Sequence, residues 1–247
     1  MVSRAVLVTG ASRGIGRAVA TAFAELGDRV AVHHRDSPAL ASGLLDELPG
    51  EGHTVVQADL ADPEAVRRVV DEAATALGGI DVLVNNAGVF LHHPVTDLTY
   101  EEWQAAWRRT LDLNLAGAAN MIWCALPHMP RGGRIVNVSS RGAFRGEPDS
   151  PAYGASKAGL NALTQSLAVS LAPKGIAVAA VAPGFVETDM TNEHLKPPRG
   201  DEIRAQSPFG RVARPEEIAA AVVYLASPEA EWASGTIIDL NGASYLR

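Results

Sequence analysis

Cysteine and positive charge are both scarce in this chain of 247 residues. Cys124 is its only cysteine, which excludes an intrachain disulfide. Because this residue lies in the apolar run MIWCAL, we interpret it as a buried, inert thiol rather than a nucleophile. Lysine and arginine number 21 against 28 aspartates and glutamates, which gives a net charge of −7. Nucleic acids require a basic face, so this balance argues against nucleic acid as a main partner.

Long apolar runs and targeting signals are also missing. No apolar stretch reaches the roughly 20 residues that cross a membrane, and the opening MVSRAVLVTG enters a strand pattern without the layout of a signal peptide. We therefore expect a soluble, cytoplasmic protein with no membrane partner. Hydrophobic residues make up 47 % of the chain, enough for a sizeable core. With no internal repeat or linker, we predict one α/β domain over 1–247 and no metal site.

The first predicted strand ends in a glycine-rich turn. Residues 5–8 are a short apolar run, and RAVATAFAEL after the turn has helical periodicity. Glycines let the backbone approach a pyrophosphate, and the helix N-terminus offers free N–H groups and a positive dipole end. The turn TGASRGIG has the spacing G-x-x-x-G-x-G, which differs from the commonest dinucleotide fingerprint. It predicts cofactor contacts from Gly10, Ser12, Arg13, Gly14, Ile15 and Gly16.

The end of the second strand bears on the choice of cofactor. We expect this strand at 29–33, and the residue just beyond it usually contacts the adenosine ribose, where an acid favours NAD. His34 holds that position and Arg35 follows it. Arg13 and Arg35 together suit a 2′-phosphate, because guanidinium groups match phosphate geometry, so NADP(H) is favoured over NAD(H). In the alternative, both arginines are solvated and Asp36 takes the ribose.

Two further strands, expected at 53–57 and 82–84, also end in candidate cofactor contacts. Asp59 is a candidate for holding the adenine edge, whereas Asp62, which precedes a proline, suits the N-cap of the next helix. The later strand runs into NNAG, whose amides can pin neighbouring backbone and whose glycine lets a cofactor pass close. The contacts predicted here are Asp59, Leu60, Asn86, Ala87 and Gly88.

A long helix is expected from Tyr100 to about Pro127, with Asn114 inside its apolar stretch. A buried amide in such a helix needs a partner. Asn114 is therefore either a satisfied core residue or part of a kinked turn whose freed backbone group holds a water.

Strands expected at 134–138 and 177–181 bring more polar groups to the same edge. The first is followed by Ser139 and Ser140, and the second runs into APGFVET. In open α/β sheets, ligands bind beyond the carboxyl ends of the strands, so these groups should gather with the glycine turn and NNAG. The second strand end contributes the predicted cofactor contacts Pro183, Gly184, Val186 and Thr188.

Tyr153 and Lys157 lie four residues apart in a segment with helical periodicity. Residues at this spacing share one face of a helix, so the phenol and the ammonium point into the same space. A free tyrosine titrates near about 10, and a nearby cation lowers the pKa of the phenol and makes it a usable general acid or base. The pair alone also fits an exposed tyrosine and a solvated lysine on a surface helix.

Residues 189–207 are polar, contain two prolines and a glycine, and show little regular pattern. Such a segment inside a compact domain is often a lid, so we predict a substrate lid here. A helix at 215–225 and a strand at 236–240 are expected to complete the domain, with the tail NGASYLR at a subunit contact.

Together, these motifs resemble those of the short-chain dehydrogenase/reductase family in its single-domain form. The match extends from Ala5 to about Gly242 and rests on TGASRGIG, Asp59-Leu60, NNAG, Asn114, Ser then Tyr-x-x-x-Lys, and PGFVET, in that order. The resemblance implies a Rossmann-type, doubly wound parallel sheet of about seven strands with helices on both faces. It also implies a catalytic group made of Asn114, Ser140, Tyr153 and Lys157.

The resemblance assigns each of these residues a role. Ser140 orients the substrate oxygen, and Tyr153 exchanges a proton with it. Lys157 lowers the pKa of the tyrosine and holds the nicotinamide ribose, while Asn114 places a water in a proton relay to Lys157. Family members usually place the serine about thirteen residues before the tyrosine, which selects Ser140. Ser139 is the alternative, because successive strand residues face opposite sides and only one can face the substrate.

The activity implied by the resemblance is an NADP(H)-dependent oxidoreductase that interconverts a ketone and a secondary alcohol. The pattern is most similar to 3-oxoacyl-carrier-protein reductases and related carbonyl reductases. An NAD-dependent alcohol or sugar dehydrogenase is the runner-up, and a dinucleotide-sensing regulator without turnover is the alternative outside enzymes. The family also implies a homo-oligomer, commonly a tetramer, which fits the apolar character of helices expected at 100–127 and 153–172.

Several residues outside the motifs also carry predictions. Phe144 and Phe185 are expected to form an apolar wall of the pocket. Lys174 and Arg131 suit a basic rim for an acidic carrier protein, although scattered solvated cations fit a net charge of −7 better. For the histidine pair at 92–93, a plain surface loop is favoured over the substrate mouth.

Overall fold

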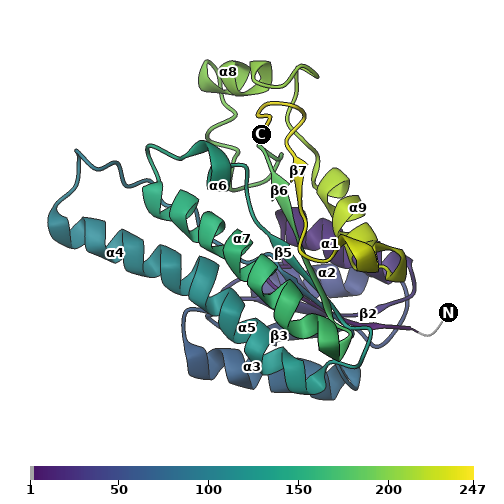
Figure 1. Ribbon diagram of the computed structural model, residues 1–247. Helices are drawn as coiled ribbons and strands as arrows, with labels where there is room; N and C mark the ends of the chain where they lie inside the picture. The colour runs from purple at the N-terminus through teal and green to yellow at the C-terminus, as the bar shows by residue number, and fades with distance from the viewer. Residues whose placement is uncertain (1–2) are drawn as a thin grey trace.

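The computed structural model describes residues 3–247, which fold around one parallel sheet. Its seven strands lie in the order β3-β2-β1-β4-β5-β6-β7. Every neighbouring pair is parallel, and helices flank both faces (Figure 1). The predicted doubly wound α/β fold is confirmed. The strands are β1 (Ala5–Val8), β2 (Arg29–His34), β3 (Thr54–Gln57), β4 (Val82–Asn85), β5 (Arg134–Val138), β6 (Ala177–Pro183) and β7 (Ile237–Leu240).

The α-helices are α1 (Gly14–Glu25), α2 (Pro38–Glu47), α3 (Pro63–Leu77), α4 (Tyr100–Leu111), α5 (Ala118–Ala125), α6 (Gly142–Arg145), α7 (Pro151–Leu171), α8 (Arg199–Ala205) and α9 (Pro215–Leu225). Helices α1, α2 and α9 pack on one face of the sheet, and α3, α5 and α7 pack on the other. Helix α8 stands apart from both layers, above the carboxyl ends of the strands (Figure 1). The sheet edge beneath α8 is therefore the edge where a ligand is expected.

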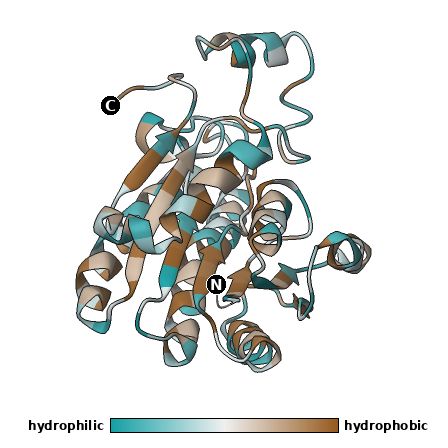
Figure 2. Ribbon diagram, turned by 90° about the vertical axis from the view of Figure 1, so that its right-hand side faces the viewer, coloured by the Kyte–Doolittle hydropathy of each residue, from teal (hydrophilic) through white to brown (hydrophobic). Residues whose placement is uncertain are grey.

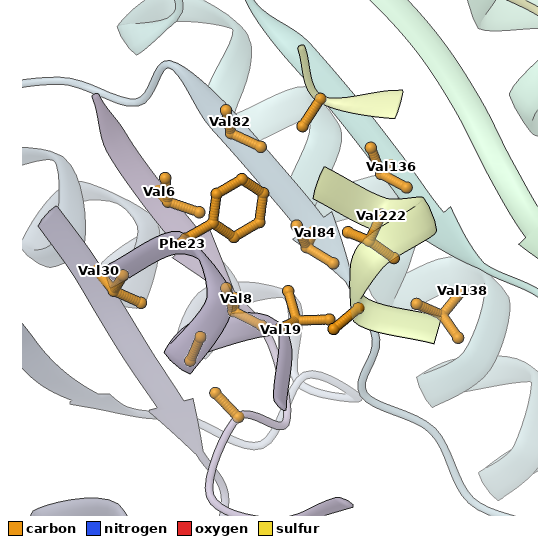
Figure 3. Packing of buried hydrophobic residues seen from close by; sticks show 14 of the residues in the cluster. Val6, Val8, Val19, Phe23, Val30, Val82, Val84, Val136, Val138 and Val222 are labelled. Atoms are coloured by element: carbon orange, nitrogen blue, oxygen red, sulfur yellow. The ribbon is translucent and has the colours of Figure 1, made fainter. Parts of the chain in front are cut away.

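Alternate residues of each central strand pack into two separate hydrophobic cores, one on each face of the sheet. In β1, Val6 and Val8 face the α1 side, whereas Ala5 and Leu7 face the α3 side. Figure 3 shows the α1-side core, where Phe23 lies among valines of the strands. Because both faces are covered, the strands read as nearly continuous apolar runs, and they appear brown in Figure 2. Full burial of a side chain such as that of Phe23 contributes roughly 1.5–3 kcal/mol.

Local capping residues determine where two of the helices begin. The Asp62 carboxylate accepts the Glu64 N–H at 3.0 Å, so the predicted N-cap of α3 is confirmed. Helix α4 begins with a capping box, in which Thr99 Oγ1 accepts the Glu102 N–H and the Glu102 carboxylate accepts the Thr99 N–H. These contacts satisfy N–H groups that a helix start leaves without partners.

The fold differs from the sequence prediction in two ways: one expected helix is interrupted, and three helices were not expected. The helix expected to run from Tyr100 to about Pro127 ends as α4 at Leu111, and a π-helical turn at Asp112–Gly117 separates it from α5. Helices α2, α6 and α8 were not predicted, because each is short or buries only a few residues. The segment expected to lack regular structure thus contains α8.

No helix within residues 3–247 combines the length and the apolar character that crossing a bilayer requires. Cys124 is partly buried on α5 and packs against the core of the α3 side. Burial raises the pKa of its thiol, which agrees with the predicted inert side chain.

Candidate active site

The main cleft lies at the carboxyl ends of β1 and β4, where the strand order reverses. Its volume is about 270 Å³. Three of the four predicted catalytic residues line it, namely Ser140, Tyr153 and Lys157. The predicted cofactor contacts that line it are Gly10, Ser12, Arg13, Gly14, Ile15, His34, Arg35, Asp59, Leu60, Asn86, Ala87, Gly88, Tyr153, Lys157, Pro183, Gly184, Val186 and Thr188. Gly16 and Asn114 do not line it and lie immediately behind its wall.

The glycine turn is held in a shape that only glycines allow. Gly14 has a φ of +55°, in the left-handed region that side chains disfavour. A Cβ atom on Gly16 would collide with the Gly10 carbonyl and the Asn86 amide. That amide donates from Nδ2 to the Thr9 carbonyl at 2.9 Å and to the Gly10 carbonyl at 3.1 Å, as predicted for NNAG. The first N–H groups of α1 have no side-chain cap and face the cleft, which suits an anion.

His33 connects this turn to the end of β3. The imidazole is buried, its Nδ1 accepts the Gly10 N–H at 3.0 Å, and its Nε2 donates to the Ala58 carbonyl at 3.2 Å. Both nitrogens are therefore used by a neutral ring with its proton on Nε2. Burial lowers the pKa of His33 to about 4. The residue was not predicted, and the available signal was a histidine inside an otherwise apolar strand.

We expect acidic pH to destabilise the fold through His33. Its pKa is 6.5 in the unfolded chain and about 4 in the fold, so between these values the unfolded chain binds more protons and the free energy of unfolding falls as pH falls. The full loss is about 3 kcal/mol. Urea titrations between pH 7 and pH 4 measure it. His33→Asn keeps a donor and an acceptor but does not titrate, so its slope should be flatter, and an unchanged slope would contradict the assignment.

Two arginines, Arg13 and Arg35, lie near the end of β2, and the Asp36 carboxylate beside them is paired. His34 is buried, its Nδ1 accepts the Ser37 N–H at 3.3 Å, and burial lowers its pKa. Arg35 pairs with Asp36 at 2.5 Å, whereas Arg13 makes no ion pair within residues 3–247. The Arg35 guanidinium, with a smaller effect from Arg13, lowers the pKa of the Asp36 carboxyl. The Asp36 carboxylate, which could otherwise accept a hydrogen bond from the ribose 2′-hydroxyl of NAD, is therefore already paired with Arg35.

Asp59 lines the cleft and is held by two partners. Its carboxylate accepts the Ala61 N–H at 3.0 Å and pairs with Arg109 of α4 at 2.9 Å. This pairing was not predicted, because Arg109 is distant in sequence. The contact between Asp59 and adenine stays a prediction.

Asn114 sits on the π-helical turn and is buried. Its Oδ1 accepts the Val89 N–H at 2.9 Å, and its Nδ2 donates to the Val89 carbonyl at 3.0 Å and to Ser156 Oγ at 3.2 Å. The amide is satisfied and the turn is kinked, while the water held by a freed backbone group stays a prediction. A Cβ on Gly88 would lie 3.2 Å from Asn114 Oδ1 and 3.7 Å from Lys157 Nζ, so these groups are close neighbours.

Tyr153 and Lys157 face the cleft from the N-terminal part of α7. The Lys157 ammonium donates to the Val138 carbonyl at 2.7 Å and lies 5.8 Å from the centroid of the Tyr153 ring. Burial lowers the pKa of Lys157 to about 8. Burial also raises the pKa of Tyr153 to about 12, although the neighbouring Ser140 hydroxyl lowers it. The net lowering of the tyrosine pKa that we predicted is not found, because desolvation of the phenolate dominates and the Lys157 ammonium donates to a carbonyl.

The two adjacent serines have different surroundings. Ser139 is buried, and its Oγ donates to the Lys157 carbonyl at 3.3 Å. Ser140 is partly exposed, its Oγ accepts the Gly142 N–H at 3.0 Å, and its hydroxyl acts on the Tyr153 pKa. These contacts support the choice of Ser140 over Ser139, whose hydroxyl already serves the fold.

Aromatic side chains connect Tyr153 to the predicted lid. The Phe90 ring packs edge-on against Tyr153 with centroids 4.8 Å apart, and the His194 ring packs edge-on against Phe90 at 5.8 Å. The apolar wall was predicted from Phe144 and Phe185, and that prediction is wrong. Phe144 packs under the Arg247 guanidinium at 3.8 Å, and Phe185 faces a second cavity. Phe90 was missed because it follows NNAG in a loop without a regular pattern.

His93 holds the start of the helix that carries Tyr153. It is fully buried, its Nε2 accepts the Ala152 N–H at 3.0 Å, and its Nδ1 donates to the Leu91 carbonyl at 2.7 Å. The N-cap Ser150 makes no capping bond and instead donates to the same carbonyl at 2.7 Å. The imidazole therefore satisfies an N–H that a capping side chain normally takes. The prediction of a plain surface loop is wrong for His93.

Lys174 and Arg131 lie at the opposite edge of the sheet. They precede β6 and β5, so they stand at the amino ends of parallel strands. Arg131 Nη1 donates to the Pro173 carbonyl at 3.4 Å. A basic rim around the cleft is therefore excluded for this pair, and the alternative of scattered surface cations holds.

Comparison with known proteins identifies the family. A family model described as enoyl-(acyl carrier protein) reductase matches residues 10–242. The 3-oxoacyl-[acyl-carrier-protein] reductase FabG of Staphylococcus aureus (strain Mu50 / ATCC 700699) is 38% identical over 248 residues, covering 99% of each chain. The chain belongs to the short-chain dehydrogenase/reductase family. The family resemblance read from the motifs is confirmed.

Two solved structures superpose closely on this chain. A short chain dehydrogenase from Burkholderia cenocepacia J2315 in complex with NADP has a TM-score of 0.90 and 35% identity, and the match covers 98% of this chain and 97% of that one. A blue fluorescent protein from a metagenomic library in complex with NADPH has the same TM-score, 0.90, and the same identity, 35%, and covers 98% of each chain.

Proposed function

We propose that this protein is an NADPH-dependent reductase that converts a ketone, such as a 3-oxoacyl thioester, into a secondary alcohol. The observation that carries the proposal is the convergence of Ser140, Tyr153 and Lys157 on the cleft beside the glycine turn. The relatives named 3-oxoacyl-[acyl-carrier-protein] reductase and the NADP and NADPH complexes support it.

The residues of the cleft fit a phosphorylated dinucleotide. The glycine turn leaves no room for side chains and presents the free N–H groups of α1, which suit a pyrophosphate. Arg13 and Arg35 would hold a 2′-phosphate, and Lys157 with the 183–188 turn would hold the nicotinamide half. When bound, the nicotinamide supplies the hydride, so the protein's task is binding, orientation and proton delivery.

The proton for the new hydroxyl comes from Tyr153 in this proposal. Ser140 donates a hydrogen bond to the substrate oxygen and orients it, and the Tyr153 hydroxyl donates its proton to that oxygen. A pKa of about 12 keeps the phenol protonated at neutral pH, as a proton donor requires. The buried Lys157 ammonium stabilises the resulting phenolate, and Asn114 holds the backbone of Val89 beside it.

The proposal is tested by following NADPH absorbance with a panel of ketones, sugars and 3-oxoacyl thioesters. We expect turnover with a thioester or another ketone, with NADPH preferred over NADH. An NAD-dependent alcohol or sugar dehydrogenase predicts turnover in the oxidative direction with NAD and an alcohol. Binding of dinucleotide with no turnover of any panel member would overturn the reductase assignment in favour of a regulator.

We also propose a homo-oligomer, commonly a tetramer in this family. Trp123 on α5 and Val169 on α7 are 66% and 78% exposed, so both helices present large apolar side chains to solvent. Light scattering at micromolar concentration is expected to give a multiple of the 25.9 kDa chain mass. A monomer would refute the proposal.

A further inference from the structure

A second cavity, of about 250 Å³, lies behind the wall of the cofactor cleft. It is lined by Arg141, by the turn after β6 and by the end of β7. Phe185 lines this cavity, whereas its neighbours Gly184 and Val186 line the main cleft. One short turn therefore separates the two, and nothing in the proposed reaction uses the second.

Arg141 places a buried positive charge at this cavity. The residue is only 4% exposed, and its guanidinium lies 5.4 Å above the centroid of the Phe185 ring. Its only side-chain hydrogen bond within residues 3–247 runs from Nη1 to Ser244 Oγ at 2.6 Å, and no carboxylate there lies within ion-pair distance. Buried arginines are normally paired, because desolvating a lone charge is costly. Burial lowers the pKa of Arg141, the neighbouring Arg145 charge adds to this effect, and the Glu147 carboxylate, which lies beyond ion-pair distance, opposes it.

Among the charged residues that line the cavity, Arg141 is the one that forms no ion pair within residues 3–247. Arg211 also lines it but pairs with Glu217 at 2.6 Å, so these two charges compensate each other. The remaining lining is mainly apolar, with Phe185 and Phe209 contributing aromatic rings. The cavity thus offers a cation at one side and apolar surface elsewhere.

We propose that this cavity binds a small amphiphilic carboxylate, with its carboxylate on Arg141 and its apolar part against Phe185 and Phe209. A guanidinium presents parallel N–H donors that match a carboxylate. The mainly apolar lining suits the alkyl part of a medium-chain acid. The bound carboxylate supplies the counter-ion that the buried arginine lacks.

Calorimetric titration with octanoate tests this site, with the protein saturated with NADP⁺ so that the cofactor cleft is filled. We expect one octanoate per chain, and no comparable binding of octan-1-ol, which lacks the charge. Ser244→Asp places a carboxylate beside the Arg141 guanidinium and should weaken octanoate binding by about tenfold or more. Ser170→Asp is the matched control, because Ser170 is exposed on α7 and does not line the cavity.

Phe209→Ala provides a second variant should Ser244→Asp fail to fold. Phe209 is 74% exposed, so its loss spares the core, and the shorter apolar wall should weaken octanoate but not acetate. The proposal is overturned if octan-1-ol binds as tightly as octanoate, or if the wild type shows no binding up to about 10 mM. Octanoate binding that neither Ser244→Asp nor Phe209→Ala changes would place the carboxylate elsewhere and also overturn it.

Discussion

Replacing Tyr153 by phenylalanine is expected to lower kcat for ketone reduction about 10²- to 10⁴-fold while NADPH still binds. The substitution keeps the ring, which packs against Phe90 at 4.8 Å, and leaves the bond from Lys157 to the Val138 carbonyl untouched. Only the proton donor is lost. NADPH absorbance measures kcat, and fluorescence titration of NADPH measures binding.

Tyr224→Phe is the matched control for this experiment. Tyr224 lies on α9, is 50% exposed and does not line the cleft, so removing its hydroxyl should leave kcat unchanged. Full activity of Tyr153→Phe would exclude this tyrosine as the proton donor and would remove the active site proposed here. Loss of NADPH binding would instead indicate that the phenol holds the cofactor.

Replacing Arg13 by serine is expected to raise the KM for NADPH about 10- to 100-fold and to leave catalysis with NADH nearly unchanged. Arg13 makes no ion pair within residues 3–247 and lines the cleft beside Arg35, so it is free to bind a 2′-phosphate. A hydrogen bond to a charged group contributes about 1.5–3 kcal/mol, which corresponds to this range of affinity. Steady-state kinetics with both nucleotides measure the effect.

Arg35→Ser should have a further consequence, because it frees the carboxylate of Asp36. That group would repel a 2′-phosphate and accept a bond from the 2′-hydroxyl, so the preference should move toward NADH. Arg17→Ser is the control, since Arg17 lies on α1 outside the cleft and pairs with Glu47. If the wild type prefers NADH, the proposal that Arg13 and Arg35 bind a 2′-phosphate is wrong.

Most of the cleft could be predicted from the sequence because its residues stand where strands end. The glycine turn, NNAG and the serine pair each follow an apolar run, and the carboxyl ends of parallel strands meet at one edge. Tyr153 and Lys157 share a face of α7 because helical geometry dictates it at this spacing. The order and spacing of these motifs along the chain were therefore sufficient to predict that their residues lie together.

Other groups were missed because their partners are distant in sequence. The nitrogens of His33 bond to Gly10 and Ala58, and His93, predicted in a surface loop, is buried and bonds to the start of α7. Phe90 packs against Tyr153, whereas neither Phe144 nor Phe185, which were predicted to form the apolar wall, lines the cleft. Periodicity reports which face of an element is buried, but it does not report what lies opposite that face.

The sequence by itself therefore determined the parallel sheet, the dinucleotide turn and the order of the catalytic motifs, because these depend on short-range spacing and apolar periodicity. Only the tertiary structure decided the pKa values of Tyr153 and Lys157, the pairing of Arg35 with Asp36 and the lack of an ion pair for Arg141 within residues 3–247. These properties depend on burial and on which charges and hydrogen-bonding groups surround each side chain. Both are set by how the packed elements bring those side chains together.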